Sequence, residues 1–414
     1  MEKGYLSSYF KAVAAKTLKP VEVDTAKSNQ HELNGVQALK NMFGSERRTF
    51  PATFIYLSDG DDSPIIESGW VTWYDARANH ATRTEYRLYF PSTDVSDSAV
   101  AGDELLIGLK PDETVLIIVA EGSSTVASQL NWLFGITDAN SRDYSIREDL
   151  NNEQDRLSIA SRWILEQIGI AAEQEDDTHL SEMIARFGDA FPVTKVFSEY
   201  ARSTLPLISA LDDPDAALVS WMEREEALFR SFEKHLVSEQ VSAEFIKEAK
   251  TELDIEAISK YFLAVQNRRK SRAGHALENH LKFILETYQL RFDCSKVTEN
   301  NSKPDFIFPG IIDYHSELFN AEYLTMLGAK TTLKDRWRQV LSEAQRIPEK
   351  HLLTLQPAIT EQQTSEMKSH NLQLVVPNAI QSTFTSEQQK WLLSVAEFIG
   401  LVLSRQQHID DGKL

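Results

Sequence analysis

Two short stretches in the last third of the chain contain residues that could hydrolyse a phosphodiester bond. Asp305 stands in KPDFIF, a short strand by composition, and Lys330 ends a second strand candidate, YLTMLGAK. Metal-assisted hydrolysis needs carboxylates that converge on one ion, and a cation beside the attacked phosphate helps it. If the two strands are neighbours, Asp305 and Lys330 lie at one edge of a sheet. Taken singly, Asp305 also fits a turn or strand cap, and Lys330 a solvated surface.

Two glutamates could complete this set. The PD-(D/E)xK nuclease pattern places its second acid two residues before the lysine, where this chain has Gly328. Glu343 lies on the helix predicted for LKDRWRQVLSEAQR, and it fills the gap if that helix folds back along the strand. Glu278, on the earlier predicted helix HALENHLKFILETYQL, could add a further carboxylate. Alone, Glu343 could also be a surface partner of Arg346 or Gln339.

The segment KTTLKDRWRQ is basic, although the chain as a whole has a formal net charge of -19. Lysine and arginine donate to guanine O6 and N7, and aspartate accepts from cytosine N4. Lys334, Asp335 and Arg336 therefore suit a GC-rich half-site of DNA. As a charge run, the three residues also fit a solvated helix face.

A second basic run, NRRKSRAGH at 267–275, precedes the helix that carries Glu278. Its cations suit contacts to DNA phosphates, which position a duplex without specifying its sequence. The residues expected to make these contacts are Arg268, Arg269, Lys270 and Arg272.

The order of these segments resembles the catalytic domain of the EcoRII restriction endonuclease family. NRRKSRAG, KPDFIFP, the pair Tyr314–His315, AKTTLKDRWRQ and LVVP carry the resemblance, which is strong over about 265–377 and weak over about 185–265. In that family the acid is moved from the strand to the following helix, which matches Lys330 and Glu343. The resemblance implies Mg2+, held by Asp305, Glu343 and Glu278, and no nucleotide cofactor.

The same resemblance implies a target and an assembly. The family cuts double-stranded DNA at CC/GG pairs that flank one central A or T, a CCWGG-like site, and its base-reading residues correspond to KDR at 334–336. Cleavage of both strands at a near-symmetric site implies a homodimer, whose two-fold axis mirrors that of the DNA. A type II restriction enzyme of this kind is expected in the cytoplasm of a bacterium.

Two aromatic residues match positions that the family uses. Relatives flip the central base pair, and Trp221 in VSWMEREEALF offers a stacking surface, although tryptophan on an amphipathic helix is more often a core residue. Tyr314 matches a tyrosine of the family. With carboxylates and a lysine in place, no tyrosine nucleophile is required, and we expect structural support from Tyr314.

Length and composition limit the class of protein. A chain of 414 residues, 42% hydrophobic and 25% charged, suggests two or three soluble domains. No apolar run of about 18 residues is present, and the start is too polar for a signal peptide. The single cysteine, Cys294, excludes an internal disulfide and fits a reducing compartment. The acidic balance excludes non-specific coating of nucleic acid but not a narrow basic cleft, because phosphate contact is local.

The elements that must position these residues differ along the chain. The last third alternates apolar strands with helices, which predicts crossover units in a mixed sheet flanked by helices, as in a restriction-endonuclease-like α/β/α domain. Helical periodicity begins near 143 and runs to 170, and long helices follow the acidic segment AAEQEDDTHLSE, 171–182. That segment is the best linker candidate.

The first third is rich in strand-like runs. PATFIYLSD, GWVTWYDAR, TEYRLYFP and the hairpin ELLIGLKPDETVLIIVAEG predict a small barrel or sandwich, followed by a helix at STVASQLNWLFG. ARANHATRTEYRLYFP and NQHELNG resemble the effector domain of EcoRII-like enzymes, a B3-like DNA-binding β-pseudobarrel. The residues expected to contact DNA there are His31, Arg77, Arg83, Glu85 and Arg87. A strand with exposed arginines is the alternative.

The sequence thus predicts an effector domain at 1–172, an acidic linker at 173–184 and an endonuclease domain at 185–414. In EcoRII-like enzymes the effector domain blocks the catalytic dimer until it binds a second copy of the site. Two other functions compete with a type II restriction endonuclease. One is a DNA-binding regulator whose nuclease fold does not cleave, and the other is a repair nuclease that nicks a single strand.

Overall fold

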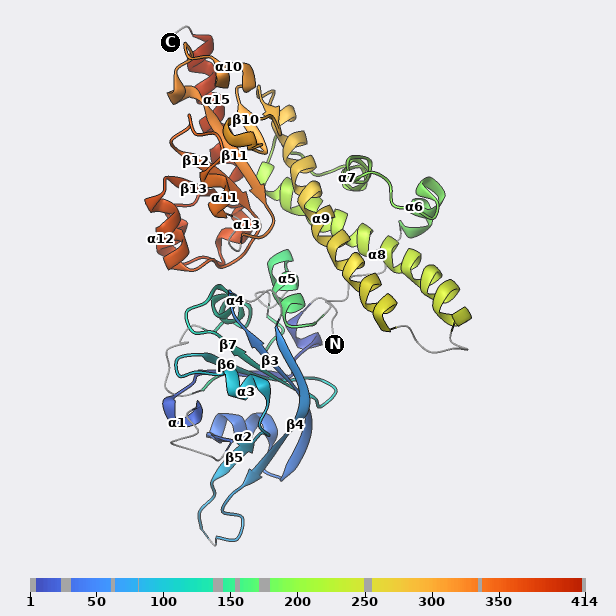
Figure 1. Ribbon diagram of the computed structural model, residues 1–414. Coiled ribbons are helices and arrows are strands. Elements are labelled where there is room, and N and C mark those ends of the chain that lie inside the picture. Colours follow the sequence, from blue (N-terminus) through green and yellow to red (C-terminus); the bar gives the residue numbers. More distant parts are fainter. Residues whose placement is uncertain are drawn as a thin grey trace. The chain divides into compact units, whose positions relative to one another are not determined.

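The computed structural model describes residues 5–23, 31–60, 64–80, 82–136, 144–152, 157–170, 179–248, 255–333 and 337–411 (Figure 1). The chain divides into a first unit, Met1–Glu173 with Ala358–Thr360, and a second unit, Gln174–Pro357 with Glu361–Leu414. Within the described ranges, no helix combines the length and the apolar character needed to cross a membrane.

The first unit is built on one mixed sheet of eight strands. The strands are β1 (Ala12–Thr17), β2 (Glu32–Asn34), β3 (Arg48–Leu57), β4 (Ile65–Asp75), β5 (Tyr86–Tyr89), β6 (Glu104–Leu109), β7 (Val115–Ala120) and β8 (Ser145–Arg147). Their order is β2-β5-β4-β3-β7-β6-β1-β8, and only the β3/β7 pair is parallel. The predicted β6/β7 hairpin is present, and Asp112 Oδ1 in its turn accepts the Thr114 N–H at 3.0 Å.

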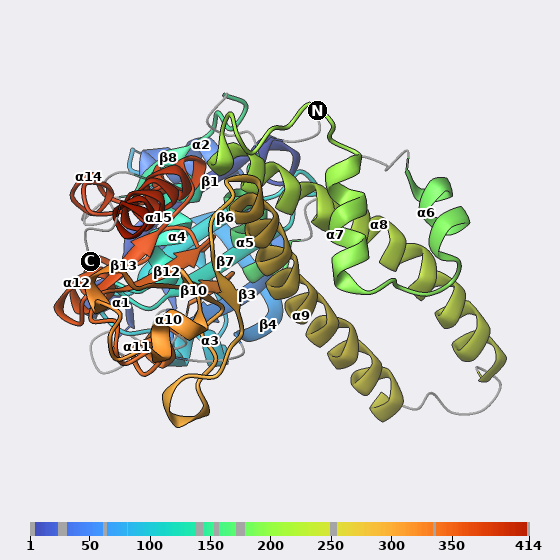
Figure 2. The ribbon, with the colours of Figure 1, turned by 90° about the horizontal axis from the view of Figure 1, so that it is seen from above.

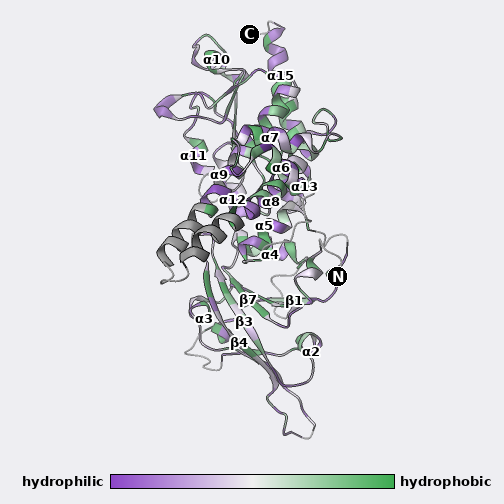
Figure 3. Ribbon diagram, turned by 90° about the vertical axis from the view of Figure 1, so that its right-hand side faces the viewer, coloured by the Kyte–Doolittle hydropathy of each residue, from purple (hydrophilic) through white to green (hydrophobic). Residues whose placement is uncertain are grey.

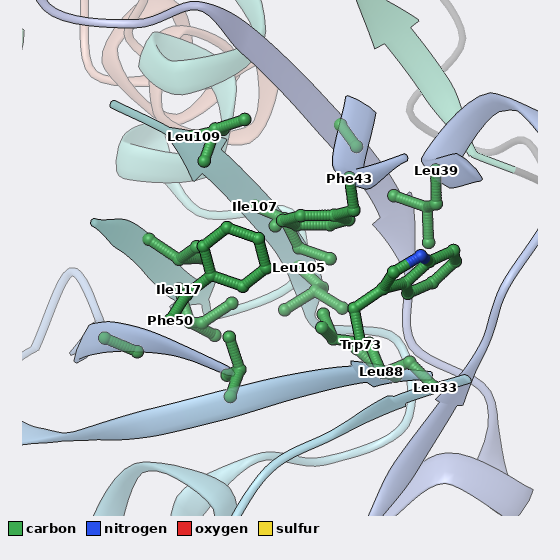
Figure 4. Close-up of a cluster of buried hydrophobic side chains, with 14 of the residues drawn as sticks. Leu33, Leu39, Phe43, Phe50, Trp73, Leu88, Leu105, Ile107, Leu109 and Ile117 are labelled. Atoms are coloured by element: carbon green, nitrogen blue, oxygen red, sulfur yellow. The ribbon is translucent and has the colours of Figure 1, made fainter. Parts of the chain in front are cut away.

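Short helices complete this unit: η1 (Leu6–Ser8), α1 (Pro20–Val23), α2 (Gln37–Phe43), α3 (Asp94–Ser98), α4 (Thr125–Leu133) and α5 (Ile159–Gln167). All six residues of β7 are buried, and they alternate between two apolar clusters on opposite faces of the sheet. Figure 4 shows the first cluster, in which Phe43 from α2 packs 5.5 Å from the ring of Trp73. The second cluster lies under α4 and α5.

One prediction for the first unit needs correction. The helical periodicity assigned to 143–170 includes β8, which pairs with β1, so only α5 is helical in the described part of that range. A three-residue strand is too short to have a period of its own, and its partner decides its conformation. Within the described residues, β2 and β8 are the edges of the sheet and are not paired with each other. The B3-like assignment stays a prediction.

The second unit contains the mixed sheet predicted for the last third. Its strands are β9 (Asp293–Cys294), β10 (Phe306–Phe308), β11 (Thr325–Lys330), β12 (Lys350–Thr354) and β13 (Leu372–Val375). Neighbours from β9 to β11 are antiparallel, and those from β11 to β13 are parallel. The parallel pairs are joined by crossovers that contain α11 (Trp337–Leu341) and α12 (Glu361–Ser369).

Helices flank this sheet. They are α6 (Leu180–Phe187), α7 (Thr194–Ser203), α8 (Pro214–Glu248), α9 (Ile255–Thr287), α10 (Ile311–His315), α13 (Asn378–Gln381), α14 (Ser386–Gln389) and α15 (Val395–Asp410), with 3-10 turns η3 (Glu299–Asn301) and η4 (Ala321–Tyr323). In Figure 2, α7 lies beside the long helices α8 and α9. Polar and apolar residues mix along α15, whose buried residues recur every three or four positions (Figure 3).

The start of the second unit is helical earlier than predicted. Residues 171–178 lie outside the described residues, but the last five positions of the predicted linker, 180–184, belong to α6. Met183 is fully buried and packs in one cluster with Phe229 and Phe232 of α8. Because residues 171–182 are rich in acidic side chains, the sequence did not reveal the apolar positions at the start of α6. The predicted linker at 173–184 therefore extends too far.

Candidate active site

Asp305 and Lys330 meet at the ends of neighbouring strands. Asp305 immediately precedes β10, Lys330 is the last residue of β11, and these strands are antiparallel. Lys330 Nζ lies 2.9 Å from Asp305 Oδ2, and the same oxygen accepts the Ala329 N–H at 2.7 Å. Both side chains are partly exposed. The predicted proximity is therefore present, and the carboxylate is held by two donors.

Glu278 and Glu343 stand on either side of this pair in the sequence, and both interact with it electrostatically. Burial, and then the negative charge of Asp305, raise the pKa of Glu278 on α9. Burial and the Asp305 charge also raise the pKa of Glu343, while the ammonium groups of Lys330 and Lys350 oppose the shift. Carboxylic acids that lie close together resist ionisation, and a bound cation would stabilise their ionised form.

The donor set suits a hard divalent cation such as Mg2+, which prefers carboxylate oxygen. However, among the residues that the structure describes, no group of three or more His, Cys, Asp or Glu side chains is arranged to hold a metal ion. The predicted set of Asp305, Glu343 and Glu278 is thus not assembled as a three-ligand group, and Lys330 neutralises Asp305 instead.

Gly328 explains why no acid stands two residues before the lysine. A Cβ atom at Gly328 would lie 3.3 Å from Val340 Cγ2 and 3.3 Å from Leu352 Cδ1. Val340 on α11 therefore occupies the space in which a side chain at 328 would begin. The close approach of α11 to β11 brings Glu343, three residues after Val340, towards the Asp305–Lys330 pair.

Glu343 is not on a helix, contrary to the prediction for LKDRWRQVLSEAQR. Within the described residues, α11 ends at Leu341, and the Glu343 N–H bonds to the carbonyl of Val340 at 3.1 Å. Ala344, which the predicted helix includes, is buried but has a left-handed φ of 45°. Apolar spacing alone does not reveal such a turn. Lys334, Asp335 and Arg336 lie outside the described residues, so their role stays a prediction.

The basic run on α9 is only partly available for phosphate contact. The Arg272 guanidinium lies 4.8 Å from the ring centroid of Phe191 and 5.3 Å from that of Phe229, and it donates to the Pro192 carbonyl. Arg272 therefore packs among aromatic rings, and its phosphate contact stays a prediction. The sequence shows the four charges but not which face of α9 packs against α7 and α8.

The other three residues of the basic run at 267–275 have surroundings different from those of Arg272. Arg269 Nε forms an ion pair with Glu233 at 2.6 Å, although half of its side chain is exposed. Arg268 lies 5.6 Å from the ring centroid of Phe191. Both phosphate roles stay predictions, and the side chain of Lys270 lies outside the described residues.

Trp221 is a core residue. It is 3% exposed, and its ring lies 5.6 Å from that of Phe283 and 5.8 Å from that of His280. Its faces are covered, so the structure contradicts stacking of Trp221 on a flipped base and supports the core interpretation. Next to it, His280 Nε2 lies 2.9 Å from the Glu225 carboxylate, a buried contact that the sequence gave no signal for, and burial lowers the pKa of His280.

Tyr314 has the supporting position expected for it. The side chain is 1% exposed, and its hydroxyl donates to the Glu299 carboxylate at 2.6 Å. Burial and this hydrogen bond raise the pKa of the Tyr314 phenol. A buried phenol that resists ionisation is a poor nucleophile. The partner, Glu299, was not singled out by the sequence because it belongs to no recognisable motif.

In the first unit, three of the expected DNA contacts form one ionic chain. Arg87 bonds to Glu85 at 2.6 Å and to Glu32 at 2.5 Å, and Arg77 bonds to the same Glu85. Arg87 and Arg77 are therefore paired with carboxylates, although 44% of the Arg77 side chain is exposed. Arg83 is exposed on the described surface, and His31 stacks edge-on against Phe90 at 5.7 Å. Their roles in DNA contact stay predictions.

Comparison with known protein families and curated proteins gives matches to restriction enzymes. The family described as EcoRII C terminal matches residues 229–399. The type II restriction enzyme EcoRII of Escherichia coli is 44% identical over 137 residues, 33% of this chain and 34% of that protein. The type II restriction enzyme SsoII of Shigella sonnei is 28% identical over 127 residues, 28% of this chain and 41% of that protein. The chain thus spans well under two thirds of either relative.

Two solved structures are similar to parts of the chain. Metal-depleted Ecl18kI in complex with uncleaved, modified DNA has 18% sequence identity and a TM-score of 0.46, covering 57% of this chain and 86% of that one. The complex of restriction endonuclease PspGI with substrate DNA has 16% identity and a TM-score of 0.43, covering 52% of this chain and 93% of that one.

Proposed function

We propose that this chain, which carries an EcoRII C-terminal domain at residues 229–399 and is thereby related to EcoRII-like type II restriction enzymes, is a site-specific endonuclease of double-stranded DNA. The observation that carries the proposal is the 2.9 Å contact between Lys330 and Asp305. Burial and the Asp305 charge raise the pKa of Glu278 and of Glu343 beside it. A nuclease fold retained only for docking would be expected to lose one of these four groups.

The proposed mechanism assigns one task to each group. Asp305 and Glu343, with Glu278 as a further carboxylate, would hold Mg2+. The bound ion would supply a Lewis acid and a water molecule of lowered pKa. The Lys330 ammonium, close to Asp305, is in a position to stabilise the negative charge that develops on the attacked phosphate. Asp305 in turn orients that ammonium through their ion pair.

The proposed target is a CCWGG-like site, in which CC/GG pairs flank a central A or T, and the proposed assembly is a homodimer. The support is the match of the EcoRII C-terminal family and the unbroken KDRWRQ segment. We assign the first unit to a B3-like effector that binds a second copy of the site and restrains the catalytic unit. A regulator without cleavage activity and a nicking nuclease are the competing functions.

Digestion of a supercoiled plasmid separates these functions. With Mg2+, we expect linear DNA with ends that map to a CCWGG-like site, and no cleavage after chelation of the metal. Nicked circles alone would indicate the single-strand nuclease, and bound but intact plasmid would indicate the regulator.

Alanine substitutions test the assignment of the catalytic groups. Asp305→Ala, Lys330→Ala and Glu343→Ala should each abolish cleavage and leave specific binding of the plasmid site largely intact, because each side chain acts at the reacting phosphate. Binding is measured by gel shift without Mg2+. Wild-type cleavage by Glu343→Ala would refute the relocated acid.

A further inference from the structure

Glu343 lies in a turn whose backbone conformation depends on contacts with other parts of the fold. The Glu343 turn, Glu343–Ile347, follows α11 and contains one left-handed residue, Ala344, whose conformation costs about 1–2 kcal/mol in an L-residue. Inside the turn, the Ile347 N–H bonds to the Ala344 carbonyl at 2.9 Å. A short turn with this conformation needs support from other parts of the fold.

The Arg346 side chain supplies much of that support. Its Nη1 donates to the carbonyls of Tyr314 and of Ser316, the latter at 2.8 Å, and its Nη2 donates to the carbonyl of Phe319 at 2.6 Å. These carbonyls belong to the end of α10 and to the loop after it. A planar guanidinium presents five N–H donors in a rigid fork, a geometry that the compact ammonium of lysine does not reproduce.

The backbone of the turn is held from the same side. The Glu299 carboxylate accepts the Gln345 N–H at 3.3 Å, and the Tyr314 hydroxyl accepts the Arg346 N–H at 3.3 Å. Tyr314 in turn donates to Glu299. Two consecutive N–H groups of the turn are therefore bound by a pair of side chains that are bound to each other.

A buried lysine closes the other end of the turn. Lys350, 7% exposed, donates from Nζ to the Ile347 carbonyl at 2.9 Å. Its charge interacts with both Glu299 and Glu343. The turn is thus fixed at 345, 346 and 347, while its first residue extends a carboxylate towards Asp305.

We propose that Arg346 is a positioning residue, which holds the Glu343 turn against α10 and so keeps the Glu343 carboxylate within reach of the ion shared with Asp305. The inference rests on the proposed nuclease function. Loss of the guanidinium would remove a donor from the carbonyls of Tyr314, Ser316 and Phe319, of which that of Ser316 keeps the Phe319 N–H, and would release the turn three residues from Glu343. A displacement of about 1 Å in an active site can cost about 100-fold in rate.

The test compares metal binding as well as cleavage. Mn2+ binding to the full-length protein, without DNA, is followed by electron paramagnetic resonance for the wild type, Arg346→Ala, Arg346→Lys, Glu343→Ala and the double variant. We expect Arg346→Ala to weaken Mn2+ binding by about tenfold or more, Arg346→Lys to restore it only in part, and the double variant to bind no more weakly than Glu343→Ala. Single-turnover cleavage should need correspondingly more Mg2+.

Arg405→Ala is the matched control. Arg405 on α15 also serves a carbonyl, that of Leu324 at 3.2 Å, and bonds to Thr325 Oγ1 at 2.7 Å, at the end of β11 opposite to Lys330. Its loss should lower thermal stability without changing the Mn2+ affinity. Wild-type Mn2+ binding by Arg346→Ala, or an additive further loss in the double variant, would overturn the proposal, as would a wild type that binds no Mn2+. A wild type that binds Mn2+ but does not cleave refutes only the proposed function, because the Mn2+ titration still decides the role of Arg346.

Discussion

At the scale of single residues, Glu278 and Glu343 are held where ionisation is unfavourable. Burial and the Asp305 charge raise the pKa of each above the ordinary value in the folded protein. The folded state then binds these protons more tightly than the unfolded state. Below the unfolded pKa both states are protonated and the effect vanishes; as the pH rises through the folded pKa, the ionised carboxylates reduce stability. The candidate active site therefore weakens the fold near neutral pH.

We expect Glu278→Gln and Glu343→Gln to raise the unfolding temperature of the second unit near neutral pH. The gain should be roughly 2–4 °C, the shift that about 1 kcal/mol produces in a domain of this size. It should disappear below about pH 4, where glutamate is protonated even in the unfolded chain. Scanning calorimetry across this pH range measures both effects.

The control for these variants is Glu387→Gln, at an exposed ion pair with Lys390. It should leave the unfolding temperature nearly unchanged. Added Mg2+ should stabilise the wild type and not Glu343→Gln, since the ion offsets the repulsion among the carboxylates. A lower unfolding temperature for both active-site variants at neutral pH would mean that the glutamates stabilise the fold.

At the scale of elements, the packing of α11 on β11 determines where the second acid can stand. Gly328 packs so closely against Val340 that a Cβ atom added at position 328 would lie 3.3 Å from Val340 Cγ2. We expect Gly328→Ala to destabilise the second unit by about 1–3 kcal/mol through overpacking. Val340→Ala should also destabilise it, because it opens a cavity. Together the two changes should cost less than their sum, since each relieves the other.

Denaturant unfolding of the two single variants and the double variant measures this coupling. Ala329→Gly, at the neighbouring position whose side chain points to the other face of β11, is the control and should not couple with Val340→Ala. Strict additivity of Gly328→Ala and Val340→Ala would show that the two side-chain positions do not compete for space.

The sequence predicts those parts of the elements that depend on local pattern. The apolar run YLTMLGAK indicated a strand, and the alternation of strands and helices in the last third indicated crossover units. The Asp305–Lys330 contact followed from the expectation that KPDFIF and YLTMLGAK form neighbouring strands. The end of α11 could not be predicted in this way, because contacts distant in sequence fix the Glu343 turn. These contacts come from Arg346, Tyr314 and Glu299, which lie up to 47 residues apart in the chain.

Local sequence pattern also does not predict which polar and aromatic side chains are buried. The periodicity of α9 is compatible with Arg272 in solvent or among aromatic rings, and only the docking of α7 and α8 selects the second position. The same holds for Trp221, whose contact with Phe283 joins α8 to α9. The basic run at 267–275 supplied the role proposed for Arg272, and family resemblance supplied that of Trp221; tertiary packing contradicts the second role.

At the scale of the whole molecule, the division into two units makes control of one by the other possible. The segment EQEDD at 173–177 carries four carboxylates between the two predicted domains, next in sequence to a unit with basic helices. In the proposed enzyme, the first unit restrains the second until DNA is bound. A bias of only 1.4 kcal/mol lowers the competent population about tenfold, so weak contacts are enough.

We therefore predict that a fragment of residues 174–414, which keeps α6 and its packing against α8, is dimeric and cuts a one-site plasmid faster than the full-length chain does. Removal of a restraint with a bias of about 1.4 kcal/mol should raise the single-turnover rate about tenfold. On a two-site plasmid the difference should shrink, because a second site relieves the restraint in the full-length protein. If the first unit merely adds affinity, the fragment is slower than the full-length chain at low enzyme concentration and equal to it at saturation. Rates measured at saturating enzyme on both plasmids distinguish the two cases, and a fragment no faster than the full-length chain on the one-site plasmid excludes autoinhibition.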